Sequence, residues 1–468
     1  MTLQLLSPKL ARNVARILVL GPLALSFTRA QTTSVPHAPA SSACQVEPVE
    51  YKGWQAQRLS NRWVQLIVLP QNGGRLIQVT FAGHSYLFVN PKYAGKYLPP
   101  SESHWFNYGG DKLWLLPEGN NDEQHWVGNS DLIDDGTYSF RKISEGEHCE
   151  VELTSPADPR TGIQIQRTIR LDPDSPRIRF HATMKNTTGH TVEWSMQSVS
   201  QYDTADSSDP SRFNREFRTF TPANPASSYL NHYHVRFGPA ENPAASVRDD
   251  GLFALHYVHM AAELWLDSTA GWLAVVDGSS KYGMIERFQF EDTQAYPGKA
   301  SVIFWTNGPE VKLGADGEPS MSSGGDGSPY YLEAEVNSPL CRLRPGEICS
   351  LDTEWFPTRA TSEFHGVTDA GTVVRPLRAT PAENGKITLS GSFGVFFAGR
   401  LVAHVYSEHG GAMQNIPVAD VDPAELVSLE AEIAISGKPT RISLHLEDSQ
   451  GLDRGSLQEV SVGSGENR

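Results

Sequence analysis

Acidic and aromatic side chains alternate in a short segment near residue 333. Tyr331, Glu333 and Glu335 are each separated by one residue, and successive side chains of a β-strand point to opposite faces of its sheet. The three side chains therefore share one face if the segment is a strand. Two carboxylates on one face repel each other, which can raise the pKa of one of them. The alternative is a charged strand face exposed to water.

Histidines are the other side chains that could transfer a proton. His232 and His234 are separated by one residue, so their imidazoles share a side if this segment is extended. The same spacing can bind a metal ion, but the sequence offers no third ligand to pair with them, and we expect no metal and no cofactor. His125, His256 and His259 are the alternative proton donors.

Two glycine-containing segments combine turn residues with polar and aromatic side chains. The first, residues 72–79, reads NGGRLIQV and contains Arg75. The second, residues 105–118, reads WFNYGGDKLWLLPE, and we expect its Lys112 to face the surface. The side chains of this second segment that could contact a ligand are Trp105, Asn107, Asp111 and Trp114.

These segments, together with the acidic run that continues into Ser338-Pro339-Leu340 and Pro345-Gly346-Glu347, resemble the galactose-mutarotase-like superfamily, the aldose epimerases and their relatives. The GGR strand followed by GG and WLLP looks like the hexose-phosphate mutarotase branch. A closer resemblance is to a branch of exported bacterial proteins that share an NxGGDxLW element and a late ExE element. The resemblance covers about residues 50–357.

The resemblance implies an all-β fold, a supersandwich of large antiparallel sheets packed face to face with a broad cleft suited to a sugar. Aromatic rings stack on the apolar face of a sugar ring, while polar side chains hydrogen-bond its hydroxyls. We expect two or three of the tryptophans to face the cleft, and the candidates are Trp105, Trp114, Trp126, Trp194, Trp265, Trp272 and Trp305. Arg75 could instead be a structural strand residue. The expected substrate-binding side chains are Arg75, Asn107, Asp111, Trp114, Trp105 and Tyr331.

Mutarotases need a base at the anomeric hydroxyl and an acid at the ring oxygen. In the family a late-strand glutamate is the base, which implies Glu335, with Glu333 second. His232 or His234 would then be the acid. This sequence departs from the family after residue 194, where Gln197, Ser198 and Gln201 stand in place of the expected histidine segment.

Short alternating runs broken by glycine, proline, asparagine and aspartate occupy residues 48–358 and predict half-buried strands. Residues 252–266 suit either a helix or two strands, and residues 203–214 are expected to be a polar loop. We expect a linker over residues 359–383 and a small β-sandwich over residues 384–468.

The first 47 residues differ in composition from the rest. Residues 1–30 have a basic leader, a short apolar run and a small-x-small end, typical of a secretory signal peptide, and residues 31–47 read as a flexible tether. We therefore expect an exported protein, periplasmic or secreted, without a membrane span after signal removal. The net charge of −15 argues against a nucleic-acid partner.

Four cysteines fit an oxidising compartment. Cys341 and Cys349 flank Arg344-Pro345-Gly346, so a hairpin there would place them opposite each other. A disulfide or two ordinary small apolar residues both suit this pattern, and Cys44–Cys149 is the remaining pairing.

The sequence thus predicts an exported carbohydrate-binding protein with a mutarotase-like cleft that interconverts sugar anomers by Glu/His acid–base catalysis. A non-catalytic glycan-binding or scaffold protein is the alternative. The sequence indicates neither the sugar nor an oligomeric state.

Overall fold

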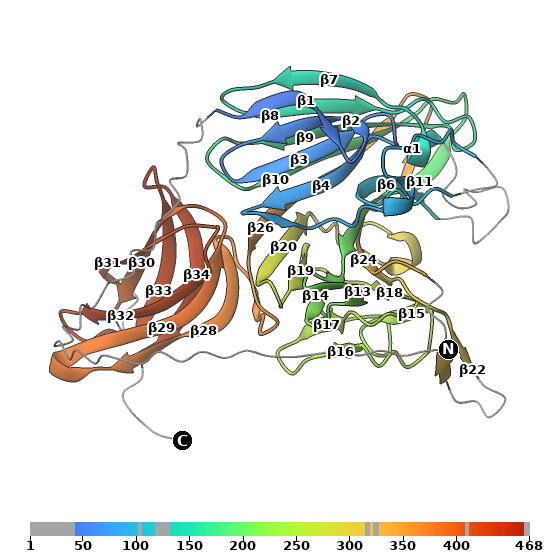
Figure 1. Cartoon of the computed structure of the whole chain (residues 1–468). Coiled ribbons are helices and arrows are strands. Elements are labelled where there is room, and N and C mark those ends of the chain that lie inside the picture. The colour runs from blue at the N-terminus through green and yellow to red at the C-terminus, as the bar shows by residue number, and fades with distance from the viewer. Residues whose placement is uncertain are drawn as a thin grey trace, which may run out of the picture. The chain divides into compact units, whose positions relative to one another are not determined.

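The computed structural model describes residues 43–101, 105–117, 132–313, 319–321, 327–407 and 411–462 (Figure 1). The expected signal peptide, and the tether up to residue 42, lie outside these residues. Residues 45–47, expected in the tether, begin the first strand. Within the described residues, no helix is both long and apolar enough to cross a membrane.

Antiparallel strands dominate the fold, which confirms the all-β expectation. The first large sheet has twelve strands. In spatial order it contains β1 (Gln45–Tyr51), β2 (Trp54–Ser60), β3 (Val64–Leu69), β4 (Arg75–Phe81), β6 (Asp111–Leu116), β11 (Val192–Asp203), β24 (Tyr331–Asn337), β21 (Val302–Thr306), β18 (Ala262–Leu266) and β15 (His234–Phe237), with β5 (His84–Ser85) beside β4 and β25 (Cys341–Leu343) beside β11.

The second large sheet has ten strands. In order these are β16 (Ala245–Val247), β17 (Leu252–His256), β14 (Phe217–Pro222), β19 (Trp272–Asp277), β20 (Tyr282–Phe288), β26 (Ile348–Arg359), β10 (Ile178–Asn186), β9 (Ile163–Leu171), β8 (Cys149–Thr154) and β7 (Ser139–Ser144). Residues 252–266 therefore form two strands, β17 and β18, and no helix.

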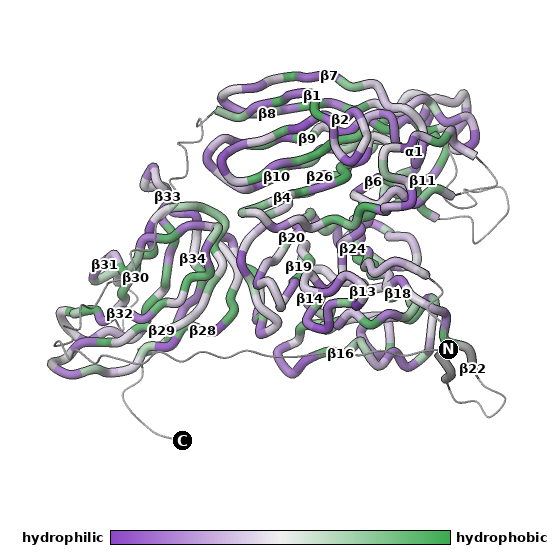
Figure 2. Tube along the Cα trace, in the orientation of Figure 1, coloured by the Kyte–Doolittle hydropathy of each residue, from purple (hydrophilic) through white to green (hydrophobic). Residues whose placement is uncertain are grey.

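The two large sheets are held together by a shared hydrophobic core. In β9 and β10 buried residues alternate with more exposed ones, and the same alternation appears as changes of hydropathy along the strands (Figure 2). One cluster of buried residues contains members of both sheets, such as Leu115 of β6, Ile165 of β9 and Leu332 of β24. Each sheet thus buries one apolar face against the other, as period-two patterning predicts.

Short elements connect these strands. The expected polar loop at residues 203–214 contains a small hairpin, β12 (Ala205–Asp206) and β13 (Asp209–Phe213). The remaining short elements are α1 (Leu132–Asp135), the 3₁₀ turns η1 (Pro91–Tyr93), η2 (Pro297–Lys299) and η3 (Glu383–Gly385), and the pair β22 (Val311–Leu313) and β23 (Pro319–Met321).

The C-terminal strands form two four-stranded sheets, as a small sandwich requires. One contains β27 (Gly366–Val367), β28 (Gly371–Pro381), β29 (Lys386–Val395) and β32 (Val427–Ala434), and the other contains β31 (Ala412–Val421), β30 (Gly399–Tyr406), β33 (Arg441–Asp448) and β34 (Asp453–Ser461). The expected linker was wrong over residues 366–381, because Pro376 and Pro381 lie within β28, where the register is interrupted by bulges. Proline is tolerated at such irregular positions.

Two disulfides join segments of the first 350 residues. Cys341 is bonded to Cys349 across the turn closed by the hydrogen bond from the Glu347 amide to the Arg344 carbonyl, although β25 and β26 on either side pair in different sheets and do not form the expected hairpin. Cys44 is bonded to Cys149. The second bond ties the residue preceding β1 of the first large sheet to β8 of the second. Both pairings considered from the sequence are therefore present.

Candidate functional site

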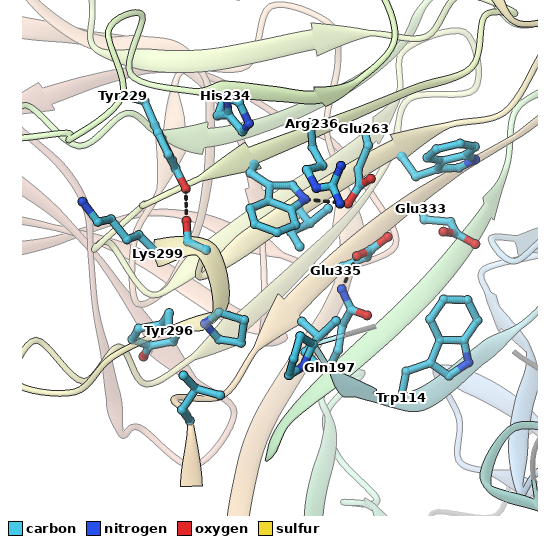
Figure 3. A pocket seen from close by; sticks show the side chains of 18 of the residues that line it. Trp114, Gln197, Tyr229, His234, Arg236, Glu263, Tyr296, Lys299, Glu333 and Glu335 are labelled. Carbon is cyan, nitrogen blue, oxygen red and sulfur yellow. Dashed lines mark hydrogen bonds between the residues drawn. The ribbon is translucent and has the colours of Figure 1, made fainter. Parts of the chain in front are cut away.

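A cavity of about 1030 Å³ opens on one face of the twelve-stranded sheet (Figure 3). Its floor is formed by six neighbouring strands, β6, β11, β24, β21, β18 and β15, and the turn at η2 closes one side. The polar and aromatic side chains that line it include Trp105, Trp114, Gln197, Tyr229, His234, Arg236, Glu263, Trp265, Tyr296, Lys299, Trp305, Asn307, Tyr331, Glu333 and Glu335.

Strand register decides which side chains reach this cavity. Glu335 of β24 pairs with Val199 of β11 and with Ile303 of β21. Residues that face each other in such a ladder lie on the same side of the sheet, and so do residues two apart on one strand. Glu333 and Glu335 therefore point to the cavity, while Leu332 and Ala334, which alternate with them, point into the core between the sheets.

Both glutamates of β24 are nearly buried, with 6% of Glu333 and 5% of Glu335 exposed. The Gln201 amide donates a hydrogen bond to Glu333 Oε1 at 2.5 Å, and the Gln197 amide donates to Glu335 Oε2. These glutamines lie where the sequence departs from the mutarotase pattern. They fix the direction of the two carboxylates, which a binding site needs.

A third carboxylate, Glu263 of β18, also lines the cavity and was not anticipated. The indole of Trp265 donates a hydrogen bond to Glu263 Oε1 at 2.5 Å. Burial raises the pKa of Glu263, and the nearby charge of Glu333 raises it further. The alternation of Glu263 and Trp265 in the sequence is the same signal that identified Glu333 and Glu335.

Four of the tryptophans considered from the sequence line the cavity, more than the two or three expected: Trp105, Trp114, Trp265 and Trp305. Tyr331 is a fifth aromatic wall residue, as expected. Trp194 instead is buried with its indole bonded to the Thr161 carbonyl, and Trp126 lies outside the described residues. The cavity is thus rich in flat apolar surface suited to the C–H face of a sugar ring.

Lys112 was expected at the surface, and that expectation was wrong. It pairs with Val199, so it points to the cavity side of the sheet, and only 1% of it is exposed. Its Nζ lies 3.9 Å from Glu333 Oε1 and 4.3 Å from the centre of the Trp114 ring. Burial lowers the pKa of Lys112, and the Glu333 carboxylate opposes that effect.

Asp111, expected to bind substrate, lies on the opposite face. It is fully buried and forms an ion pair of 2.5 Å with Arg167 of β9, across the interface of the two large sheets. The hydroxyls of Ser198 and Ser200 also donate hydrogen bonds to it. Burial raises the pKa of Asp111, and Arg167 works against that rise. Neighbouring residues of a strand point to opposite faces of the sheet, so an error of one residue in the expected register reverses both side chains. Asp111 therefore faces the core and Lys112 faces the cavity side, the opposite of what we expected.

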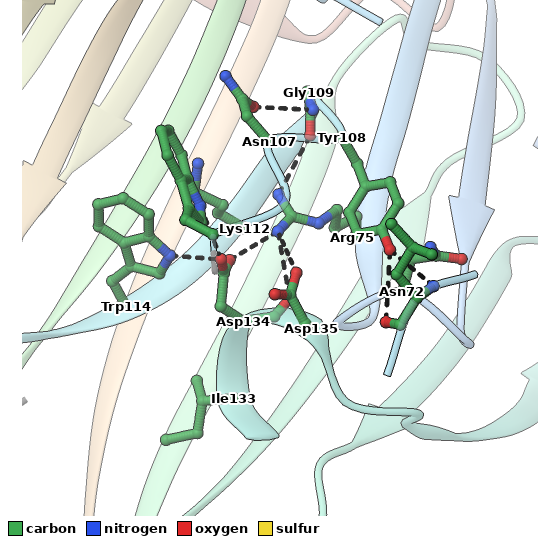
Figure 4. Close-up of polar contacts among 12 residues, drawn as sticks. Asn72, Arg75, Asn107, Tyr108, Gly109, Lys112, Trp114, Ile133, Asp134 and Asp135 are labelled. Carbon is green, nitrogen blue, oxygen red and sulfur yellow. Dashed lines mark hydrogen bonds and ion pairs between the residues drawn. The ribbon is translucent and has the colours of Figure 1, made fainter. Parts of the chain in front are cut away.

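Arg75 does not line the cavity but supports its wall (Figure 4). It is fully buried, with its guanidinium 2.7 Å from Asp134 and 3.5 Å from Asp135, and it also donates to the Gly109 carbonyl. The carboxylate of Asp134 accepts hydrogen bonds from the indoles of two wall residues, Trp105 at 3.1 Å and Trp114 at 2.9 Å. Arg75 therefore positions the wall through Asp134, which the sequence analysis did not identify.

Asn107 and His232 are not among the lining residues either. Asn107 Oδ1 accepts a hydrogen bond from the Gly109 amide at 3.1 Å and so shapes the turn before β6. His232 has a φ of 62°, so the segment is not extended there, and its imidazole lies against the Asn224 carbonyl. His234 does line the cavity, but it is exposed. The two imidazoles therefore do not form the shared face that the spacing suggested.

Within the described ranges, one group of side chains is close enough to hold a metal ion: His404, His445 and Asp453 of the C-terminal strands. The two imidazoles are stacked with ring centres 4.0 Å apart and planes at 13°. His445 Nδ1 is 2.9 Å from Asp453 Oδ2. Because a ring nitrogen binds a metal in the plane of its ring, two parallel rings cannot both bind one ion without rotating.

No family model matches this sequence, and no curated protein matches it. Solved structures do resemble it. One is a galactose mutarotase-like protein from Clostridium acetobutylicum, with 10% identity and a TM-score of 0.42 over 68% of this chain and 99% of that chain. Another is a putative aldose 1-epimerase from Escherichia coli, with 9% identity and a TM-score of 0.39 over 68% of this chain and 99% of that one.

A third is a TPR-domain containing protein from Parabacteroides distasonis, with 15% identity and a TM-score of 0.44 over 67% of this chain; this chain spans 48% of its length. All three TM-scores are below 0.5, so the roles of the cavity residues rest on their own geometry.

Proposed function

We propose that this chain is an exported carbohydrate-binding protein whose cavity holds a sugar ring and interconverts its anomers. The observation that carries the proposal is the convergence of four tryptophans and four carboxylates, Glu193, Glu263, Glu333 and Glu335, in one cavity of about 1030 Å³. Aromatic faces and fixed hydrogen-bonding groups are the two features that carbohydrate recognition requires. The basic leader and the two disulfides support export to the periplasm or the medium.

Glu335 is the proposed base. Its carboxylate is held by Gln197 at the centre of the cavity floor, where it could accept the proton of the anomeric hydroxyl. His234 is poorly placed to be its acid. The two residues belong to the same ladder row but are three strands apart, about 14 Å at the usual strand spacing of about 4.8 Å.

Anomer exchange can be measured directly by two-dimensional NMR exchange spectroscopy on a panel of aldoses, with and without the full chain. The proposal predicts faster exchange for at least one sugar, and a loss of at least about 100-fold in Glu335→Gln. Glu432→Gln, on the exposed side of a C-terminal strand, is the matched control and should keep the wild-type rate. Unaccelerated exchange across the panel would remove the catalytic proposal.

The separation of His234 from Glu335 favours a second candidate, a glycan-binding protein without turnover. Calorimetric titration with the same sugars separates the two candidates, because binding without accelerated exchange supports the second. An absence of binding to the whole panel contradicts both.

A further inference from the structure

Lys112 is a buried amine whose hydrogen-bonding capacity is unused. Among the residues that the structure describes, its Nζ is shielded from water and has no hydrogen-bond partner, although 3.9 Å separates it from Glu333 Oε1. An ammonium group carries three donors, and leaving them unsatisfied in a buried position is costly. A ligand bound in the neighbouring cavity could supply the hydrogen-bond acceptor that the Lys112 ammonium group lacks.

The surroundings of Lys112 hold its amine directly behind side chains that line one end of the cavity, although Lys112 is not itself a lining residue. Nζ lies 4.3 Å from the ring centre of Trp114 and 5.5 Å from that of Trp105. Both indoles are fixed by hydrogen bonds to Asp134, so the rings form a rigid support for the cation. Trp105, Trp114 and Glu333 all line the cavity, so a sugar bound there would contact the same side chains that contact Nζ.

Burial lowers the pKa of Lys112 and so favours the neutral amine. The carboxylates that face Lys112 act in the opposite direction and favour the protonated form. Glu333 and Asp134 are the strongest favourable neighbours, Glu335 adds to them, and Arg75 opposes them. An amine balanced in this way can release and regain a proton more readily than an exposed lysine. Arg75 is itself paired with Asp134 and Asp135, which reduces its repulsion.

We propose that Lys112 is the catalytic acid of the cavity, donating a proton to the ring oxygen of the bound sugar while Glu335 accepts the proton of the anomeric hydroxyl. This inference rests on the proposed function. The bond between C1 and the ring oxygen breaks, the anomeric C–O bond becomes a carbonyl, Lys112 becomes neutral and Glu335 becomes a carboxylic acid. After rotation about C1–C2 the same transfers run backwards, so both side chains return to their starting charges.

Glu333 has a separate role in this arrangement. Its carboxylate is the nearest counter-charge to Nζ, and its bond from Gln201 holds it in place. It therefore favours the protonated form of Lys112 against the burial that lowers the pKa of this amine, and it can accept a hydrogen bond from a second sugar hydroxyl. Lys112 also replaces the imidazole that the sequence analysis expected, since it comes from β6, on the side of Glu335 opposite to His234.

The test compares Lys112→Met and Lys112→Arg with wild type in the full chain, using the exchange assay and calorimetric titration with the sugar that wild type accelerates. Lys112→Met should lower the rate constant of exchange at saturation by at least about 100-fold, with the dissociation constant changing less than about tenfold. Lys112→Arg should restore part of the rate and shift the alkaline limb of its pH profile upwards, because arginine stays protonated at higher pH. Lys142→Met, a change at an exposed lysine of β7, is the control.

Thermal unfolding keeps the result interpretable. Lys112→Met removes the unsatisfied donor but leaves the nearly buried Glu333 without its nearest counter-charge, so we expect it to unfold at a lower temperature than wild type while staying folded at the temperature of the assay. A folded Lys112→Met that exchanges anomers within about threefold of wild type overturns the inference while leaving the proposed function intact. A wild-type protein that binds sugars without exchange overturns the acid role, and one that does neither overturns the proposed function as well.

Discussion

Replacing Asp111 by asparagine tests whether one face of β6 serves the core between the sheets while the other face serves the cavity. Asp111 and Arg167 are 0% and 3% exposed and only 2.5 Å apart, so the substitution leaves a buried guanidinium without its counter-charge. Removing one partner of a buried ion pair costs about 3–5 kcal/mol. Asparagine can still accept hydrogen bonds from Ser198 and Ser200, which places the expected loss near about 3 kcal/mol.

Urea denaturation followed by circular dichroism measures this loss. With a slope of about 3 kcal/mol per molar, the midpoint should fall by about 1 M. Asp352→Asn, at a carboxylate that is 69% exposed and among the described residues pairs only with His181, is the matched control and should change stability by less than about 1 kcal/mol. Sugar affinity of folded Asp111→Asn should equal that of wild type. An unchanged midpoint together with lost sugar binding would refute the assignment of Asp111 to the core.

Two further predictions concern stability. Burial raises the pKa of Glu286 to about 8, so between about pH 4.5 and pH 8 the folded state holds a proton that the unfolded chain releases. The free energy of unfolding should therefore fall as pH rises through this window. Denaturation curves at pH 5 and pH 8 measure this fall, and Glu286→Gln should make it smaller. Cys44→Ser removes a disulfide that closes a loop of 105 residues, and Cys341→Ser removes one that closes a loop of 8. Chain entropy predicts that the free energy of unfolding falls by about 5 kcal/mol in the first variant and by about 2–3 kcal/mol in the second. Denaturation under non-reducing conditions measures both values, and a Cys341→Ser variant less stable than Cys44→Ser would contradict this account.

The alternation of apolar and polar residues made most of the fold predictable. It identified strands such as β9 and β10, because each buries one face against the opposite sheet. It could not identify β28, where Pro376 and Pro381 look like linker residues but lie in a bulged strand. Nor did it decide between a helix and two strands at residues 252–266, which only pairing with neighbouring strands determines.

The candidate site was predictable where residues on one strand act together and less so where partners come from distant segments. Glu333 and Glu335 share a face of one strand, and both line the cavity as expected. The sequence around Asp111 and Lys112 carries glycines on one side and apolar residues on the other, so it did not reveal which of the two faces the core. Asp134, which fixes two tryptophans, is 20 residues from Trp114, and local patterns do not report such contacts.

Binding of a sugar in the cavity is the central claim, and saturation-transfer difference NMR tests it most directly. A bound hexose should receive saturation at the C–H protons of one ring face, since these would stack on the indoles. The signal should disappear in Trp305→Ala, which removes a cavity wall, and persist in Tyr97→Ala, which removes an aromatic ring that is 44% exposed and outside the cavity. Equal signals from wild type and Trp305→Ala, or no signal from any sugar of the panel, would contradict the account.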